Sequence, residues 1–307
     1  MTIMHVARHE IGGRSAEQAL TDIERRTFGH WHTLQYDCYS DARLQAMRDD
    51  LLDHVAARSV ADPHLGAAPS VVLDTAAECA LGRLDLGCFP GGDQEIRFPL
   101  IGESISSEDT DFEAVVEHAA TAGDWLDAFA LCLISGLMWE QGRVIGLMLR
   151  SDHASAIRDG LPHSKLRSVS DPGELAEMET LACYLTRASG HLPRDWPAVP
   201  LCMPEVDERL DGALLLGRLG ALTPDQRLLR VLLEDNQPAF ERALADRLVR
   251  HRESTPADAP PRSLLPHRTI ALAALAVQVH GWDLRVRSGY LPEVLLRAPA
   301  DAPAVVR

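Results

Sequence analysis

Lysine and net positive charge are what this sequence of 307 residues lacks most. Lys165 is the only lysine, and the chain carries 45 Asp and Glu against 30 Lys and Arg, for a formal net charge of −15. A nucleic-acid-binding surface needs clustered positive charge to meet the phosphates, so we expect no nucleic-acid partner. A basic protein partner fits better, because opposite charge speeds association.

Long hydrophobic runs are also missing. The most apolar segment, 125–139, contains Asp127 and is shorter than the roughly 18–20 residues needed to span a bilayer. The first 13 residues have neither the apolar stretch nor the cleavage site of a signal peptide. The six cysteines form no CxxC pair and are too sparse for a disulfide framework. We therefore expect a cytoplasmic protein with no membrane partner.

Motifs of known catalytic chemistry are absent from the sequence. It contains no GxSxG, GxxxxGK[ST], GxGxxG or HExxH pattern. The glycine-rich segment 90–93 lacks the lysine and the following helix of a phosphate-binding loop. We therefore predict a protein that is not an enzyme, with no catalytic residues, no bound metal and no cofactor.

A few single residues could still carry chemistry. His30 and His32, with Asp37 nearby, could hold a metal, but they flank Trp31 and are interpreted instead as an aromatic packing cluster at a helix end. Cys132 lies among apolar neighbours and is interpreted as an inert thiol, as is Cys183. His280 is interpreted as a residue at a helix C-terminus rather than a general base.

The dominant pattern is helical. After Ser40, a favourable N-cap, apolar residues recur every three or four positions through Val55, and the same spacing continues at 175–185. Thr223 and Asn236, each followed by a proline within two residues, predict two further helix starts. The segments 125–139 and 269–278 are apolar on nearly all sides and should be buried. We expect an all-α protein, either an irregular multi-helix bundle or an array of helical hairpins.

Two segments interrupt this pattern. Residues 87–110 are rich in glycine and proline and are predicted to form one long ordered loop, with a short extended piece at 95–100 and a helix following at 111–122. Residues 193–204 hold four prolines and are predicted to link an N-terminal half, 1–192, to a C-terminal half, 205–307. The two halves could still pack as one domain.

The segment 103–117, which spans the end of the long loop and the start of the helix predicted after it, is strongly acidic. Half of its charge is explained by the helix predicted there, because negative charge favours a helix N-terminus. The rest is attached to a loop, and loops on a rigid scaffold are common binding surfaces. The predicted partner-binding residues are Glu103, Glu108, Asp109, Asp111, Glu113 and Glu117. Aromatic residues make stronger anchors than charges, and the candidates are Trp196, Trp282 and Tyr290.

Extended stretches of the chain resemble the immunity protein 49 family of bacterial polymorphic toxin systems. They are MRDDLLDHVAARSVADPHLG (47–66), AAECALGRLDLGCFPGGDQEIRFPLIGESISSED (76–109), SGHLPRDWPAVPL (189–201) and LAALAVQVHGWDLRVRSGYLPEVLL (272–296). The resemblance implies an all-helical, non-enzymatic protein that binds and neutralises a cognate toxin by occlusion. It carries over no catalytic residue.

The acidic composition of this chain further predicts that the toxin is a basic protein, such as a nuclease. Two other functions stay open on the sequence alone. One is a helical adaptor or regulatory protein with a different protein partner. The other is a metal-dependent enzyme that uses His30 and His32. The oligomeric state is left open.

Overall fold

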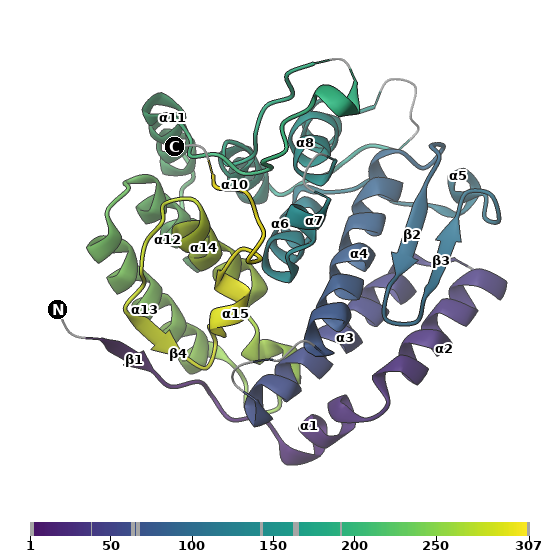
Figure 1. Cartoon of the computed structure of the whole chain (residues 1–307), viewed down its shortest axis with the longest axis horizontal. Helices are drawn as coiled ribbons and strands as arrows, with labels where there is room; N and C mark the ends of the chain where they lie inside the picture. Colours follow the sequence, from purple (N-terminus) through teal and green to yellow (C-terminus); the bar gives the residue numbers. More distant parts are fainter. Residues whose placement is uncertain are drawn as a thin grey trace.

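The computed structural model describes residues 3–37, 39–62, 65, 68–141, 144–161, 166–190 and 192–305. Cys38 and Lys165 lie outside these ranges. The described residues are mostly helical, which confirms the predicted fold class, and they include two small two-stranded sheets (Figure 1). None of the described helices is long and apolar enough to cross a membrane.

Long helices stacked side by side form the centre of the protein. α3 (Asp41–Ala61) packs on α4 (Ala68–Cys88), α4 packs on α6 (Ala122–Ser135), and α6 packs on α14 (His267–Gln278). The two helices predicted to be apolar on nearly all sides, α6 and α14, are both largely buried. In α6 the rings of Trp125 and Phe129 stack with centroids 5.1 Å apart, and the Trp125 indole donates a hydrogen bond to the carbonyl of Leu149 at 2.9 Å.

Outer helices cover this stack on two sides (Figure 1). α1 (Gly13–Leu20) and α2 (Ile23–Tyr36) pack on α3. On the other side lie α10 (Pro172–Ala182), α11 (Val206–Gly217), α12 (Pro224–Leu233) and α13 (Gln237–Ser254). The shorter elements are α7 (Leu137–Glu140), α8 (Ile145–Met148), the π-helix η1 (Leu149–His153), α9 (Ala154–Asp159), the 3-10 turns η2 (Pro193–Asp195) and η3 (Pro261–Leu264), and α15 (Glu293–Leu296).

The predicted helix starts are confirmed where a side chain caps the backbone. Thr223 accepts a hydrogen bond from the amide of Gln226, whose side chain accepts from the Thr223 amide in return, and Asn236 accepts from the amide of Ala239. Ser40 does precede α3, but its side chain makes no capping bond. These reciprocal bonds satisfy amides that a helix end leaves unpaired, so the chain can start a helix there without tertiary help.

Residues 87–110 do not form one long loop, so that prediction is wrong. α4 continues to Cys88, and β2 (Glu95–Phe98) pairs antiparallel with β3 (Glu103–Ser106) in a hairpin. Ile96, Phe98 and Ile105 are at most 1% exposed. The short extended piece predicted at 95–100 is confirmed by β2. The second strand, β3, was not predicted, because a run of four residues is too short for its alternating pattern to stand out.

The helix predicted at 111–122 is also wrong. α5 (Phe112–Val115) has only four residues, and α6 begins separately at Ala122. Thr121 and Asp124 form a capping box that starts α6, and the amide of Ala120 donates a hydrogen bond to the carbonyl of Gly87 at 3.0 Å. The tie to Gly87 therefore keeps the intervening segment out of a helix.

Segments far apart in sequence share one hydrophobic core. β1 (Met4–Val6) pairs in parallel with β4 (Val286–Ser288), so the first described strand lies beside one near the other end of the chain. Buried residues from 1–192 and from 205–307 belong to the same cluster. Within 193–204, Leu201 bridges to Leu185. The division of the chain into two halves at this segment stays a prediction.

Candidate partner-binding surface

The six predicted partner-binding residues lie along one edge of the molecule. They follow β3, the turn after it, α5 and the segment up to 117, at the side where the hairpin projects from α4 (Figure 1). Glu103 is half-buried and the other five are exposed. We call this set the acidic edge; its members are Glu103, Glu108, Asp109, Asp111, Glu113 and Glu117.

The acidic edge is anchored by buried aromatic residues. The indole Nε1 of Trp31 on α2 donates a hydrogen bond to the carbonyl of Ser104 at 3.0 Å, which fixes β3 against α2. Phe112 is 1% exposed and its ring meets that of Tyr39 edge-on at 5.3 Å. These two contacts fix β3 and the start of α5 against the core, on either side of Glu108 and Asp109.

Carboxylates of the acidic edge are not neutralised by ion pairs within the described part of the chain. Asp111 has a local role as predicted, because its side chain caps α5 by accepting from the amide of Ala114 at 3.3 Å. The only Arg or Lys between 87 and 117 is Arg97, and it pairs with the buried Glu78 at 2.8 Å. The edge therefore presents its negative charge to solvent.

Two acidic residues near this edge were missed by sequence reasoning. Asp93 precedes β2 and Glu95 begins it, and both are exposed. Glu95 lies opposite Ser106 across the hairpin, next to the carboxylates that follow β3. The signal that could have found them is the hairpin itself, because antiparallel pairing brings 93–95 beside 106–108.

An exposed row of aromatic rings lies on α2, beside the hairpin. Phe28, His32 and Tyr36 follow one another at intervals of four residues, which places them on one face of the helix. The centroid of His32 is 6.5 Å from that of Phe28 and 4.9 Å from that of Tyr36, and Trp31 packs beneath them. Phe28 is 45% exposed and Tyr36 is 66% exposed. We call Phe28, His32 and Tyr36 the aromatic ladder.

The aromatic packing predicted around 30–32 is present in the last turns of α2, and its outer face is exposed. His30 turns to the other side and its Nε2 lies 3.3 Å from a carboxylate oxygen of Asp50. The structure does not bring His30 and His32 together. Across the described residues, no group of three or more His, Cys, Asp or Glu side chains is arranged to hold a metal.

The anchors proposed from the sequence are less accessible than the aromatic ladder. Tyr290 is fully buried, so it is excluded as a contact residue. Trp282 is half-buried and packs against Phe240 with centroids 5.5 Å apart, and Trp196 is half-buried as well. Exposure depends on contacts with α13 and with the start of the chain, which a local pattern does not report.

The candidate nucleophiles lie in surroundings that suppress their reactivity. Burial raises the pKa of the Cys132 thiol well above its usual range, and it raises that of the half-buried Cys183 as well. His280 is buried between Tyr184, whose hydroxyl is 3.0 Å from Nε2, and Asp235, whose carboxylate is 2.7 Å from Nδ1. Both ring nitrogens are thus used in structural contacts that join the segments following α10, α12 and α14.

A serine and a histidine also lie close together, but their hydrogen bonds oppose nucleophilic chemistry. The hydroxyl of Ser263 donates to the carbonyl of Pro260 at 2.7 Å, so it accepts from Nε2 of His9 at 2.9 Å. Nδ1 of His9 then accepts from the hydroxyl of Tyr290 at 2.6 Å. In this arrangement His9 is not the acceptor of the serine proton that a general base would have to be.

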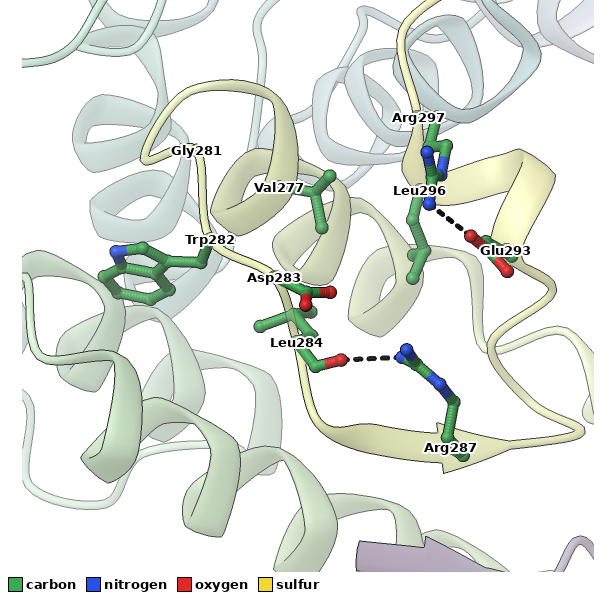
Figure 2. Close-up of a pocket in the computed structure, with 9 residues that line it drawn as sticks. All are labelled: Val277, Gly281, Trp282, Asp283, Leu284, Arg287, Glu293, Leu296 and Arg297. Carbon is green, nitrogen blue, oxygen red and sulfur yellow. Dashed lines mark hydrogen bonds and ion pairs between the residues drawn. The ribbon is translucent and has the colours of Figure 1, made fainter. Parts of the chain in front are cut away.

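A hollow of about 310 Å³ lies inside the C-terminal segment that contains β4 and α15 (Figure 2). Figure 2 shows Arg287 and Arg297 on one side of it and Trp282 pointing away from both. Arg297 pairs with Glu293, and Arg287 donates to the carbonyl of Leu284 at 2.6 Å. Both cations thus bind oxygens of the wall itself, and we assign no ligand to this hollow.

Comparison with known proteins gives one positive result. A family model for immunity protein 49, a typically non-enzymatic family, matches residues 62–295. The matched range contains the whole acidic edge, whereas the aromatic ladder precedes it. No curated protein and no solved structure matches the chain. Since the family model covers most of the chain, the protein belongs to the immunity protein 49 family, the immunity proteins of polymorphic toxin systems.

Proposed function

We propose that this protein neutralises a cognate toxin by binding it through the acidic edge and the aromatic ladder and covering the toxin's active site. The observation that carries the proposal is the exposure of Phe28 and Tyr36 directly beside an unneutralised acidic surface. Strong protein interfaces have a few aromatic anchors at their centre with polar and charged residues around them. The two surfaces together have that composition.

The negative charge of this face favours binding of a basic partner. Between 87 and 117 eight acidic residues are opposed by Arg97 alone, and the whole chain carries a net charge of −15. Opposite charges on the two proteins raise the association rate and orient the encounter. A nuclease fits this requirement, because an active site that binds phosphates is itself basic. The exposed faces of Phe28 and Tyr36 could receive arginine or lysine side chains of such a toxin through cation–π contacts.

Rigidity of this face supports neutralisation by occlusion. Trp31 ties α2 to Ser104, and Phe112 packs against Tyr39, so few groups would have to be ordered on binding. A pre-organised surface loses less entropy when it associates. A standard interface buries about 1,600 Å² in total, which α2, the hairpin and α5 together are large enough to supply.

The proposal is tested first by co-expressing the protein with the toxin encoded beside it. We expect a stoichiometric complex and restored growth. Phe28→Ala and Tyr36→Ala should each weaken binding about 30-fold, the cost of losing an anchor worth about 2 kcal/mol. The control is Val294→Ala, an equally exposed apolar residue on α15, which should leave affinity unchanged. Loss of affinity in the control, or none in the ladder variants, would contradict the proposal.

The acidic edge is tested separately by association kinetics. The triple variant Glu108→Gln, Asp109→Asn and Glu113→Gln should slow association and reduce its dependence on salt, with little change in the dissociation rate. Asp111 is left intact because it caps α5.

A matched control for this variant removes the same charge from exposed acids around α13, with Asp246→Asn, Glu253→Gln and Asp258→Asn. Equal slowing by both triples would mean that only net charge matters and would refute the acidic edge. If wild-type protein forms no complex and gives no rescue, the helical adaptor alternative takes precedence.

A further inference from the structure

α11 carries an apolar stripe that nothing in the described chain covers. Val206, Leu210 and Leu214 are 60%, 57% and 60% exposed, and their spacing of four residues aligns them along one face of the helix. The opposite face, with Gly212 and Leu216, is buried against α10 and α12. α11 is an edge helix that lies on the far side of the molecule from α5 and β3 (Figure 1).

Charges beside the stripe change sign along the helix. Asp207 and Asp211 flank it in the first turns, and Arg218 follows on the same flank at the C-terminal end. All three are exposed, and no ion pair among the described residues involves them. A helix with acid at one end of a stripe and base at the other is complementary to a copy of itself in the antiparallel orientation.

We propose that α11 is the contact helix of a two-fold symmetric homodimer. If the two-fold axis crosses the stripe at the level of residue 212, halfway between Leu210 and Leu214, then Leu210 of one copy lies opposite Leu214 of the other. The same axis brings Asp207 beside Arg218 of the second copy. The symmetry repeats each contact, so Leu210 and Leu214 of both copies are covered and Asp207 of each copy gains Arg218 of the other.

The contact is expected to be weak and concentration-dependent. A helix of 12 residues is about 18 Å long, and one helix pair buries less than the about 1,600 Å² of a standard interface. Interfaces below the standard size are typically weak and transient, so the dimer should dissociate on dilution. Since α11 lies away from the acidic edge, the dimer would leave that surface free and would carry two toxin-binding faces.

Sedimentation velocity and light scattering from about 1 to about 100 µM test the dimer directly. Wild-type protein should shift from monomer to dimer across this range, and Leu210→Asp should stay monomeric throughout. Leu210 is exposed, so the variant should fold normally, which circular dichroism and thermal unfolding would check. Val294→Asp on α15, of similar exposure, is the matched control and should dimerise like wild type.

Charge exchange tests the antiparallel arrangement. Arg218→Asp alone should weaken the dimer about tenfold, and Asp207→Arg combined with Arg218→Asp should restore it, because the double variant reverses both ends of each pair. A wild-type protein that stays monomeric at every concentration would overturn the proposal, as would an unaltered dimer in Leu210→Asp. Loss of toxin binding in Leu210→Asp without a change of oligomeric state would assign the stripe to the toxin and would overturn it too.

Discussion

The indole of Trp31 donates a hydrogen bond to the carbonyl oxygen of Ser104 at 3.0 Å, across 73 positions of sequence. This bond joins the helix that carries the aromatic ladder to the strand from which the acidic edge continues. Neither surface would hold its place relative to the other without such a tie. The buried Trp31 side chain therefore contributes directly to the relative position of the two proposed binding surfaces.

Trp31→Phe should lower the free energy of unfolding by about 1–2 kcal/mol, since the hydrogen bond and part of the packing are lost. It should also raise the dissociation rate of the toxin complex, because α2 and β3 lose their fixed spacing. Urea denaturation and surface binding kinetics measure the two effects.

The matched control for that variant is Trp139→Phe, which removes a similar indole bond, from Trp139 to Gln278 at 2.8 Å, in another part of the protein. It should cost comparable stability and leave toxin dissociation unchanged. If both variants alter dissociation equally, the effect reflects general destabilisation and not the position of the ladder.

The carboxylate of Asp127, on α6, forms ion pairs that join α6 to α3 and α14. Its carboxylate lies 2.9 Å from Arg48 on α3 and 2.8 Å from Arg268 on α14, with His267 at 3.1 Å. Burial opposes ionisation of Asp127, but the hydrogen bond from His267 and the charges of His267, Arg268 and Arg48 outweigh it and hold the pKa far below its usual range.

Asp127→Asn should therefore lower the free energy of unfolding by about 3 kcal/mol at pH 7, because buried cations lose their counter-charge. A folded-state pKa below the unfolded one stabilises the protein above about pH 4 and less as the pH falls. The difference between wild type and variant should thus shrink in acid. Denaturation at several pH values measures it, and Asp159→Asn, in an exposed pair with Arg158, should change nothing. A difference that is constant with pH would contradict this account.

Glu177 has the opposite pH dependence. Burial raises its pKa to about 7, since the side chain lies inside the packing of α10 and is 4% exposed. A carboxyl whose folded pKa is raised stabilises the protein fully below its unfolded value, and this contribution is lost as the pH rises from about 4.5 to about 7.

Glu177→Gln should consequently match wild type near pH 4 and exceed it by about 2–3 kcal/mol above pH 7. Chemical denaturation across that range is the measurement. Glu179→Gln is the control on the same helix, and it should show no such rise with pH. A Glu177→Gln variant that is less stable than wild type at pH 8 would mean that the carboxylate is ionised and bound in the folded protein.

Buried thiols should resist modification in the native protein. Burial raises the pKa of Cys88 to about 12, and the thiol of Cys132 is raised well above its usual range, so neither supplies thiolate at neutral pH. Cys183 and Cys202 are half-buried and should react first among the five cysteines that the structure describes. Iodoacetamide labelling resolved by peptide mass spectrometry measures the order. Rapid modification of Cys132 would contradict its placement in the core.

Helix starts were readable from the sequence because their causes are local. The reciprocal bonds of Thr223 and Gln226, and the cap that Asn236 gives α13, span no more than three residues. The short elements were not readable. The hairpin at 95–106 gains its stability from contacts with α2 and α4, and the separation of α5 from α6 depends on a tie from Ala120 to Gly87.

Part of the candidate surface was likewise within reach of the sequence. The acidic composition at 103–117 is visible directly, and five of its six residues are exposed. For the aromatic ladder the sequence shows only the four-residue spacing and not the exposure of the rings, because nothing local distinguishes the exposed Tyr36 from the buried Tyr290. Tyr290 is buried because His9, from the other end of the chain, packs on it.

Sequence patterns were sufficient to predict the helical class and the central position of 125–135 and 269–278, and extended sequence similarity places the chain in its family. The helical class and the buried segments follow from periodicity, capping and composition, which act over a few residues or over the whole chain at once. Which apolar side chains stay exposed to solvent depends on the tertiary packing. On α11, for example, Leu210 is exposed whereas Leu216 is buried. Exposure is set by which distant segments pack together, and the energy of that packing is shared across the fold rather than encoded at any one position.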